Sequence, residues 1–352
     1  MCLLYRALYT LQRNHSNQCG KMVDTQSRYR LYSYGYTPPE VRQSTPAYRD
    51  LYHEKAPPDK LLFDVGVKGD GPGDFIYPRG LTVTLDGDIL VADTDNNRIQ
   101  IFNQFGLYKR KFGTKGNAKG QFDQPTGVTE MPYGYIAVAD RNNRRIQVFS
   151  EEGEYKYEFP TIDPPFCVCC DKDFNTAVST TKRTIEIYNR EGKLLHCFSI
   201  GGNTRNHIGC QISINNTRAE VIVCDTFTGL VKYFKYDGKL VYKFEPKAAS
   251  EGLTMVPSAI GLSPLGDILV ADALNHVVNV YSDKGVFIKQ LLCPTDEAGA
   301  IQACAVGPEG HFIATEFSVD GPHSLKIFRY LQCVCHLTRP GSSKRSTPTQ
   351  ME

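Results

Sequence analysis

A twelve-residue phrase that recurs along the chain constrains the fold of these 352 residues more than any other feature. Residues 91–102 read VADTDNNRIQIF and residues 138–149 read VADRNNRRIQVF, and a weaker third copy occupies 270–281. Each copy alternates apolar and polar residues on both sides of a polar turn, which is the pattern of two antiparallel strands. Recurrence of such a unit at a regular interval predicts a repeat architecture.

Glycines at regular spacing divide the body of the chain into units. They are Gly106, Gly153, Gly192, Gly238 and Gly285, separated by 47, 39, 46 and 47 residues. Each unit contains four short alternating segments joined by tight turns, and one further unit follows the last glycine. Stacking six such sheets in a circle covers both faces of every sheet. We therefore predict an all-β, six-bladed β-propeller.

The two ends of the repeat array complement each other. The last unit supplies three strands, at 301–306, 311–316 and 325–329, but no fourth. An unassigned segment with the pattern of an outer strand precedes the first unit, at 60–65. We expect it to pair with 325–329 and to close the ring.

The flanks differ from the body in composition. We assign residues 59–332 to the propeller, 1–58 to a Tyr/Pro-rich leader and 333–352 to a C-terminal tail. Neither flank has a sustained apolar face, and both are punctuated by proline or small polar residues. We expect both to be disordered.

Charge and hydropathy restrict the function classes. The chain has 40 Lys and Arg against 38 Asp and Glu, and within 60–330 the balance is 29 to 32. This near-neutral body argues against DNA binding and against a general nucleic-acid coat. No apolar run reaches the ~18 residues of a membrane span, and no signal-peptide core is present. We expect a cytoplasmic protein without membrane contact, whose 12 cysteines are mostly reduced.

Several phrases of the chain resemble the NHL repeat. The resemblance rests on Pro78-Arg-Gly, on Val91-Ala-Asp followed by 97–102, and on entry loops with glycine and an aromatic residue at 71–75 and 120–122. It is strong in blades 1 and 2, good in blade 5 and degraded in blades 3, 4 and 6. Animal proteins with six such repeats include the tripartite-motif (TRIM-NHL) ubiquitin ligases. The resemblance implies a C-terminal recruiting module that binds protein or single-stranded RNA on one face.

One departure from that family concerns the ligase module. A tripartite-motif protein begins with a RING finger, B-boxes and a coiled coil, whereas no Cys/His array with paired zinc spacing precedes residue 60. Three explanations stay open: a fragment, a truncated product, or a propeller that works without its own ligase module. From the resemblance we expect a recognition module that recruits partners or substrates for protein ubiquitination, whose RING is absent from this chain.

The repeated polar residues have a structural interpretation. An Asp at a strand end accepts hydrogen bonds from turn N–H groups, and a nearby Arg pairs with it. The residues assigned to this role are Asp93, Asn97, Arg98, Asp140, Asn143, Arg145, Asp225 and Asp272. Because the aspartates belong to different blades, we do not expect them to share a metal.

A second set of residues is the candidate for binding. The loops after the outer strands, and those between second and third strands, share one face of a propeller. The candidate residues on this face are Lys68, Tyr77, Lys115, Lys119, Arg141, Arg144, Lys182, Arg183 and Arg205. Three interpretations stay open: ordinary solvated loops, a protein-binding surface, or a single-stranded RNA site in which rings stack on bases and cations contact phosphates. The short entry loop of blade 3, at 160–165, predicts a notch on this face for a partner peptide.

Metal binding and catalysis have weaker support. The cysteine clusters at 167–170 and 333–336 lack four ligands in spaced pairs, and buried reduced cysteines explain the first cluster better. The eight histidines fall in the flanks or in separate blades, and no Gly-x-Ser-x-Gly elbow occurs. We expect no cofactor, no metal and no catalytic residues in this chain.

Overall fold

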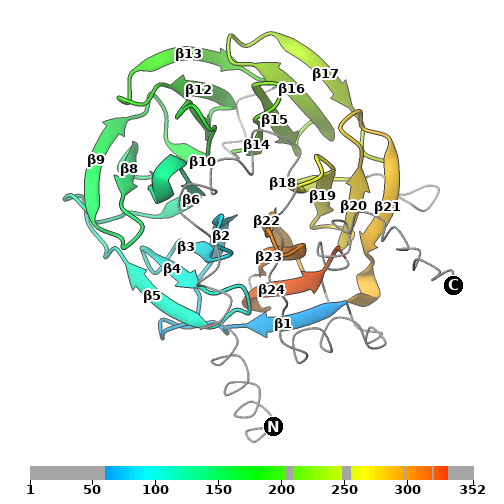
Figure 1. Ribbon diagram of the computed structural model, residues 1–352, viewed down its shortest axis with the longest axis horizontal. Coiled ribbons are helices and arrows are strands. Elements are labelled where there is room, and N and C mark those ends of the chain that lie inside the picture. Colours follow the sequence, from blue (N-terminus) through cyan, green and yellow to red (C-terminus); the bar gives the residue numbers. More distant parts are fainter. Residues whose placement is uncertain (1–59, 203–208, 248–254, 297, 319–320, 332–352) are drawn as a thin grey trace, which may run out of the picture.

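The computed structural model describes residues 60–202, 209–247, 255–296, 298–318 and 321–331. The predicted leader at 1–58 and tail at 333–352 lie outside these residues. The described residues form six four-stranded sheets arranged in a ring, which confirms the predicted six-bladed propeller (Figure 1). Two 3-10 turns, η1 (Pro132–Gly134) and η2 (Pro294–Asp296), complete the secondary structure. Nothing in the described ranges forms a helix with the length and hydropathy of a membrane span.

Five blades follow the chain order from the centre of the ring outwards. Blade 1 contains β2 (Pro78–Val83), β3 (Ile89–Asp93), β4 (Arg98–Phe102) and β5 (Tyr108–Phe112). Blade 2 contains β6 (Pro125–Glu130), β7 (Ile136–Asp140), β8 (Arg145–Phe149) and β9 (Tyr155–Pro160). Blade 3 contains β10 (Pro165–Cys170), β11 (Thr176–Thr180), β12 (Thr184–Tyr188) and β13 (Leu194–Ser199). Blade 4 contains β14 (Gln211–Asn215), β15 (Glu220–Asp225), β16 (Leu230–Lys235) and β17 (Leu240–Phe244). Blade 5 contains β18 (Pro257–Leu262), β19 (Ile268–Asp272), β20 (Val277–Tyr281) and β21 (Phe287–Leu292).

Blade 6 joins the two ends of the described chain. Its inner strands are β22 (Ile301–Val306), β23 (His311–Phe317) and β24 (His323–Arg329), and its outer strand is β1 (Leu61–Val65). Leu61 pairs with Phe328 in an antiparallel ladder, and the Arg329 N–H donates to the Lys60 carbonyl at 2.8 Å. The blue β1 therefore lies beside the red β24 in Figure 1. This pairing is the ring closure predicted from the sequence.

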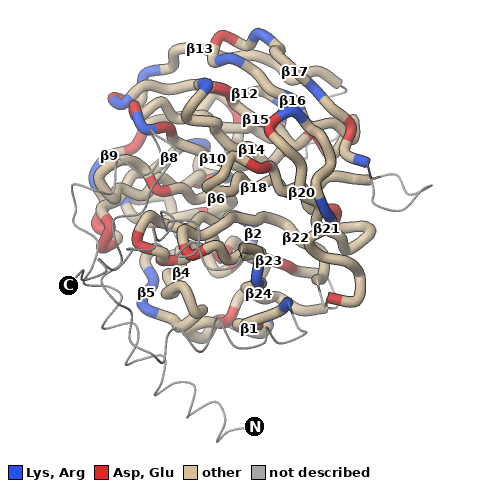
Figure 2. The backbone as a smooth tube through the Cα atoms, turned by 45° about the vertical axis from the view of Figure 1, so that its right-hand side comes forward, with Lys and Arg blue, Asp and Glu red and all other residues tan. Residues whose placement is uncertain are grey.

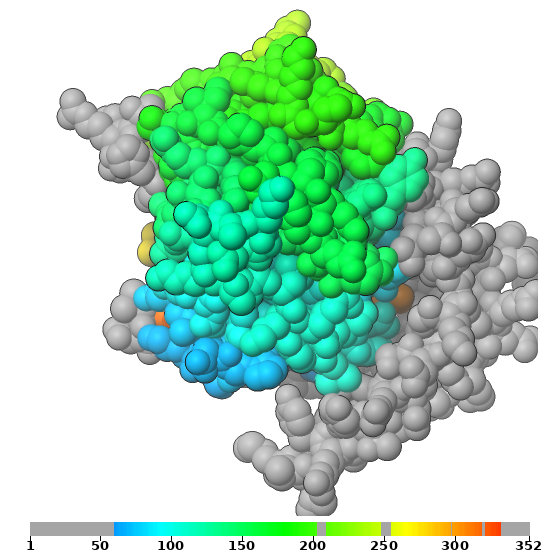
Figure 3. All heavy atoms as spheres, turned by 90° about the vertical axis from the view of Figure 1, so that its left-hand side faces the viewer, coloured from blue at the N-terminus to red at the C-terminus, as the bar shows by residue number. Residues whose placement is uncertain are grey.

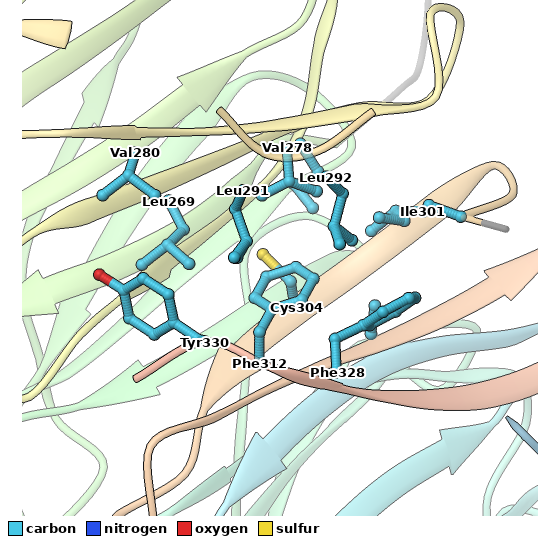
Figure 4. Packing of buried hydrophobic residues seen from close by; sticks show 14 residues of the cluster. Leu269, Val278, Val280, Leu291, Leu292, Ile301, Cys304, Phe312, Phe328 and Tyr330 are labelled. Atoms are coloured by element: carbon cyan, nitrogen blue, oxygen red, sulfur yellow. The ribbon is translucent and has the colours of Figure 1, made fainter. Parts of the chain in front are cut away.

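The core lies between blades rather than inside any one of them. Six buried apolar clusters occupy the six blade interfaces, one at each. Strand β3 shows why its residues 89–92 are all apolar: Leu90 and Ala92 face blade 2, whereas Ile89 and Val91 face blade 6. Side chains alternate across a strand, so a strand covered on both faces needs apolar residues throughout. In Figure 4 the labelled side chains of blade 5 meet those of blade 6 in one such cluster.

The repeated glycines are explained by contacts between neighbouring blades. Gly153 has φ +91°, and a Cβ at this position would lie 2.8 Å from the ring of Phe112. The same contact joins Gly192 to Phe159, the last aromatic residue of the preceding outer strand. Because positive φ and this close approach both exclude a side chain, each turn requires glycine. The 39- to 47-residue spacing of these glycines thus marks the blade repeat.

Candidate partner-binding face

One face of the ring, which we call the loop face, is built from two kinds of connection. The first kind joins each outer strand to the next blade, for example at 66–77, 113–124 and 161–164. The second kind joins the second and third strands within a blade, for example at 94–97 and 141–144. All the residues singled out for structural or binding roles lie on or next to these connections.

In blade 1 the repeated Asp fastens the two kinds of connection together. The Asp93 carboxylate accepts hydrogen bonds from the Ile76 N–H at 2.8 Å, from Arg98 Nε at 2.7 Å and from Asn96 Nδ2 at 2.9 Å. The rest of the Arg98 guanidinium donates to the carbonyls of the entry loop, including Asp70 at 2.7 Å. Burial raises the pKa of Asp93, and these hydrogen bonds oppose the rise.

Blade 2 repeats the same arrangement. The Asp140 carboxylate accepts from the Asp123 N–H at 2.8 Å, from Arg145 Nε at 2.8 Å and from Asn143 Nδ2 at 2.9 Å. Burial also raises the pKa of Asp140. Arg145 reaches the Ala118 carbonyl of its entry loop at 2.9 Å. The loops that carry the candidate binding residues therefore rest on a rigid internal network.

The asparagine equivalent to Asn143 is Asn96, not Asn97. Asn97 has φ +55°, and its Oδ1 accepts a hydrogen bond from the Gln124 N–H of the next entry loop at 2.9 Å. Arg144 occupies the same place in blade 2, with φ +53°. Asn97 thus joins blade 1 to blade 2, whereas Asn96 and Asn143 fasten the turn to its own Asp.

In blade 4 the Asp is neutralised from the neighbouring blade. Asp225 accepts from Arg183 of blade 3 at 2.8 Å and from Lys232 at 2.7 Å. Burial alone would raise the pKa of Asp225, but the bonds from Lys232, Thr228 and Arg183 outweigh it and lower the pKa. The Arg183 side chain is 2% exposed. This corrects the expectation that Arg183 lies on the binding surface, since its guanidinium is consumed inside the protein.

Asp272 in blade 5 keeps the hydrogen bonds, but no cation among the described residues pairs with it. It accepts from the Val256 N–H at 2.8 Å and from the Leu274 N–H and Asn275 Nδ2 of its own turn at 2.9 and 2.7 Å. The repeated aspartates are thus loop anchors in all four blades.

The remaining predicted cations reach the surface. The side chains of Lys68, Lys115 and Arg141 form no hydrogen bond or ion pair with an acidic side chain of the described residues, and Lys68 and Lys115 are exposed. Lys119 lies over the Tyr155 ring at 5.5 Å. Arg205 belongs to the segment outside the described residues. Lysine and arginine positions are interspersed with acidic ones in Figure 2. The connections of the loop face also carry acids, among them Asp70, Asp95 and Asp123.

The short entry loop of blade 3 is occupied by an acid. Asp163 lies 2.8 Å from Lys182 Nζ and 3.9 Å from an Arg144 guanidinium nitrogen. The backbone of Ile162 and Asp163 donates to the buried Glu186 carboxylate at 3.2 and 3.3 Å, which holds this loop down. The side chain of Ile162 remains 53% exposed beside these charges. The predicted notch therefore combines an apolar residue with two cations that are partly neutralised.

Arg79 lies beside a cluster of aromatic rings at the inner edge of blades 1 and 6. The sequence pattern did not predict this cluster. The Tyr77 ring lies 4.8 Å from the Phe317 ring and 4.9 Å from His323, and the Tyr77 N–H donates to His323 Nδ1 at 3.0 Å. The Arg79 guanidinium lies over Phe317 at 5.2 Å. Burial, and then the neighbouring Arg141, lowers the pKa of Arg79. The nearby carboxylate of Asp95 opposes this shift.

Three apolar residues on the loop face were not predicted from the sequence. Val67, Phe227 and Leu274 are 65%, 52% and 70% exposed. Phe227 covers the Arg183 guanidinium at 5.1 Å. No periodic pattern identifies them, because each is a single apolar residue inside a polar loop.

The cysteine and histidine groups do not assemble a metal site in the described part of the chain. Cys167 and Cys169 share one face of β10, where both sulfurs approach the Ile212 carbonyl, at 3.8 and 3.0 Å. Burial raises the pKa of Cys170 to about 12. The candidate cluster at 333–336 lies outside the described residues.

Comparisons with known proteins support the repeat assignment. A family model described as NHL repeat matches residues 75–102. Tripartite motif-containing protein 2 from Homo sapiens is 41% identical over 54 residues, which are 15% of this chain and 7% of that protein. E3 ubiquitin-protein ligase TRIM32 from Homo sapiens is 47% identical over 49 residues, 14% of this chain and 8% of that protein. Protein brain tumor from Drosophila melanogaster is 51% identical over 41 residues, 12% and 4% of the two chains. The matches thus span less than a tenth of the length of these relatives.

Solved structures share the fold at low sequence identity. A catalytically inactive virginiamycin B lyase from Staphylococcus aureus superposes with a TM-score of 0.53 at 14% identity, covering 74% of this chain and 82% of that chain. A protein of unknown function from Bacteroides thetaiotaomicron gives 0.59 at 12% identity, covering 75% of both chains. At such identities the likeness shows the fold alone. These findings show a six-bladed propeller fold and a match to the NHL repeat at residues 75–102, and over short stretches the chain resembles tripartite-motif proteins.

Proposed function

We propose that the chain is a non-catalytic recognition module whose loop face over blades 1 to 3 binds a protein partner. One observation carries the proposal: the repeat arginines are consumed in internal ion pairs, whereas Lys68, Lys115 and Arg141 have no acidic partner among the described residues. Unpaired cations on rigidly anchored loops, with Ile162 exposed nearby, suit an acidic surface on a partner.

The context of this recognition is proposed by analogy. TRIM32 is named as an E3 ubiquitin-protein ligase. By that likeness the propeller would select substrates, and a RING module would carry out ubiquitin transfer. This assignment rests on the similarity of one repeat region and not on residues of the loop face.

The test is a charge reversal of the loop face. A triple variant, Lys68→Glu, Lys115→Glu and Arg141→Glu, is expressed in cells beside the unmodified chain, and the co-purifying proteins are quantified by mass spectrometry. A matched control reverses three exposed lysines elsewhere, at Lys111, Lys172 and Lys284. We expect a set of partners to be lost from the first variant and kept by the control. Equal losses from both variants, or none, would contradict a binding role for the loop face.

The group around Phe317 favours a second candidate function, the binding of single-stranded RNA. Half-buried rings at Tyr77 and Phe317, with the Arg79 guanidinium over Phe317, provide stacking surfaces next to a cation, and Arg141 lies close enough to Arg79 to lower its pKa. Selection from random RNA pools at two salt concentrations separates the two functions. RNA recognition predicts a short enriched motif, affinity that falls with salt, and loss of binding in an Arg79→Ala, Arg141→Ala variant.

A further inference from the structure

The outer strands of blades 3, 4 and 5 each expose apolar side chains on the rim of the ring. The outer strands β13, β17 and β21 are neighbours along the perimeter of the ring (Figure 1). Beside Tyr242 (44%), the large apolar residues exposed on these strands are Leu194 (37%), Leu195 (44%), Leu240 (45%), Val241 (47%), Phe287 (40%) and Ile288 (49%). We call these six residues the rim band.

Blades 1 and 2 treat the same positions differently. The third residue after the turn glycine is Lys109 in blade 1 and Lys156 in blade 2, and both are exposed. In blades 3, 4 and 5 that residue is Leu195, Val241 or Ile288. Figure 3 shows the side of the ring on which the outer strands of blades 1 and 2 form the surface. Lysine on an edge strand is a common protection against unwanted pairing, and blades 3 to 5 lack it at this position.

The strands that carry the rim band also have charged residues of one sign. The outer strands of blades 3 to 5, each taken with the residue before it, contain four lysines and no acidic residue. These lysines are Lys193, Lys239, Lys243 and Lys289. By contrast, the outer strand of blade 2 and the residue before it carry Glu154 and Glu158. The strands of the rim band therefore combine apolar residues with lysines, whereas the exposed acids Glu191, Asp237 and Glu245 lie in the turns beside them.

We propose that the rim band is a docking surface for an acidic, amphipathic segment of another protein. Apolar side chains of such a segment cover Leu195, Val241 and Ile288, and its carboxylates meet the flanking lysines. Charge argues against the other occupants. A second copy would bring two sets of lysines together, and residues 1–59 carry eight Lys and Arg against five Asp and Glu. Residues 332–352 carry three against one, so neither end of this chain complements the band. The surface is separate from the loop face, and the proposal does not depend on the function assigned to that face.

The test introduces lysine at the positions in blades 3 to 5 that are equivalent to Lys109 and Lys156. The variant Leu195→Lys, Val241→Lys, Ile288→Lys gives blades 3 to 5 the residue that blades 1 and 2 already tolerate at this position, so the fold should be kept. A display library of random 12-residue peptides is selected on the full chain in the presence of excess variant as competitor. Enriched peptides are synthesised, and their affinity for both proteins is measured by fluorescence anisotropy.

We expect enriched peptides to combine acidic with apolar residues and to bind the variant at least tenfold more weakly. A control variant with three lysines on the opposite side of the ring, Tyr108→Lys, Tyr133→Lys and Glu151→Lys, should bind them as the unmodified chain does. Absence of enrichment, basic peptides, or peptides that bind the variant equally well would overturn the proposal. A dimer in sedimentation analysis that the variant abolishes would also overturn it, because the occupant would then be a second copy.

Discussion

Removal of the Asp225 carboxylate is the sharpest test of how the blades are held together. Asp225 is fully buried and accepts from Arg183 at 2.8 Å and from Lys232 at 2.7 Å. The two cationic side chains are only 2% and 10% exposed. The variant Asp225→Asn keeps the shape of the side chain but leaves two buried cations without a counter-charge.

The expected cost follows from that burial. Removing one partner of a buried ion pair typically destabilises a protein by about 3–5 kcal/mol, because the remaining charge cannot recover its hydration. For a propeller of this size each kcal/mol shifts the melting temperature by roughly 2 °C, so we expect a fall of roughly 6–10 °C. Thermal unfolding followed by circular dichroism, with urea titration for the free energy of unfolding, measures both quantities. Asp272→Asn is the matched control, since Asp272 makes turn hydrogen bonds without a cation, and it should cost only about 1–2 kcal/mol.

A compensating variant separates charge from packing. If unpaired charge is the cause, replacing all three residues with apolar ones (Arg183→Met, Asp225→Leu, Lys232→Met) should recover most of the stability lost in Asp225→Asn. An Asp225→Asn protein that melts within 2 °C of the unmodified chain would refute the reasoning.

Three further predictions follow from the fold. Deletion of residues 60–66 removes β1 and leaves the outer edge of β24 without a partner, so the melting temperature should fall by roughly 10 °C. The control Asp64→Ser, on the exposed side of β1, should change the melting temperature by less than about 2 °C. A deletion variant that melts at the same temperature as the unmodified chain would contradict ring closure. Gly153→Ala places a Cβ 2.8 Å from the Phe112 ring at φ +91°, which should cost more than about 1 kcal/mol in urea titration, and Phe112→Ala should relieve part of this in the double variant. Burial lowers the pKa of His311 to about 4. Between pH 6.5 and 4 the unfolded chain therefore binds more protons than the folded chain. As the pH is lowered across that range, the free energy of unfolding should fall by about 3 kcal/mol, and His311→Gln should abolish this loss. An equal loss in the variant would assign the pH dependence to other groups.

Most of the architecture could be predicted from local patterns. The alternation within strands and the turn glycines depend on residues close together in the sequence. The unassigned segment before the first blade was found by counting the strands of each blade. The glycines were informative because positive φ and an aromatic neighbour leave no room for any other residue at Gly153. Closure was predictable because Leu61–Val65 completes the only blade of the described chain that lacks an outer strand in sequence order.

The errors concern contacts between blades and the register of turns. Arg183 looked like an exposed loop cation because its partner, Asp225, lies 42 residues away on the next blade. Asn97 and Asn143 looked equivalent because both precede an Arg, whereas the turn places Asn96 on the Asp. Arg79 lies on the innermost strand, and its proximity to Arg141 depends on how two blades pack. Sequence periodicity gives the direction of a side chain within a strand, but it does not show which neighbouring blade the side chain meets.

Ring closure by β1 also determines how the propeller would respond to mechanical tension. Because β1 and β24 are antiparallel, the start of β1 and the end of β24 lie side by side, with the Lys60 carbonyl bonded to the Arg329 N–H. A pull on the two ends of the described chain therefore opens this ladder one rung at a time, like a zipper, instead of shearing all its rungs together. The ring should open at low force at blade 6, while the other five blades, each held by continuous hairpins, remain folded.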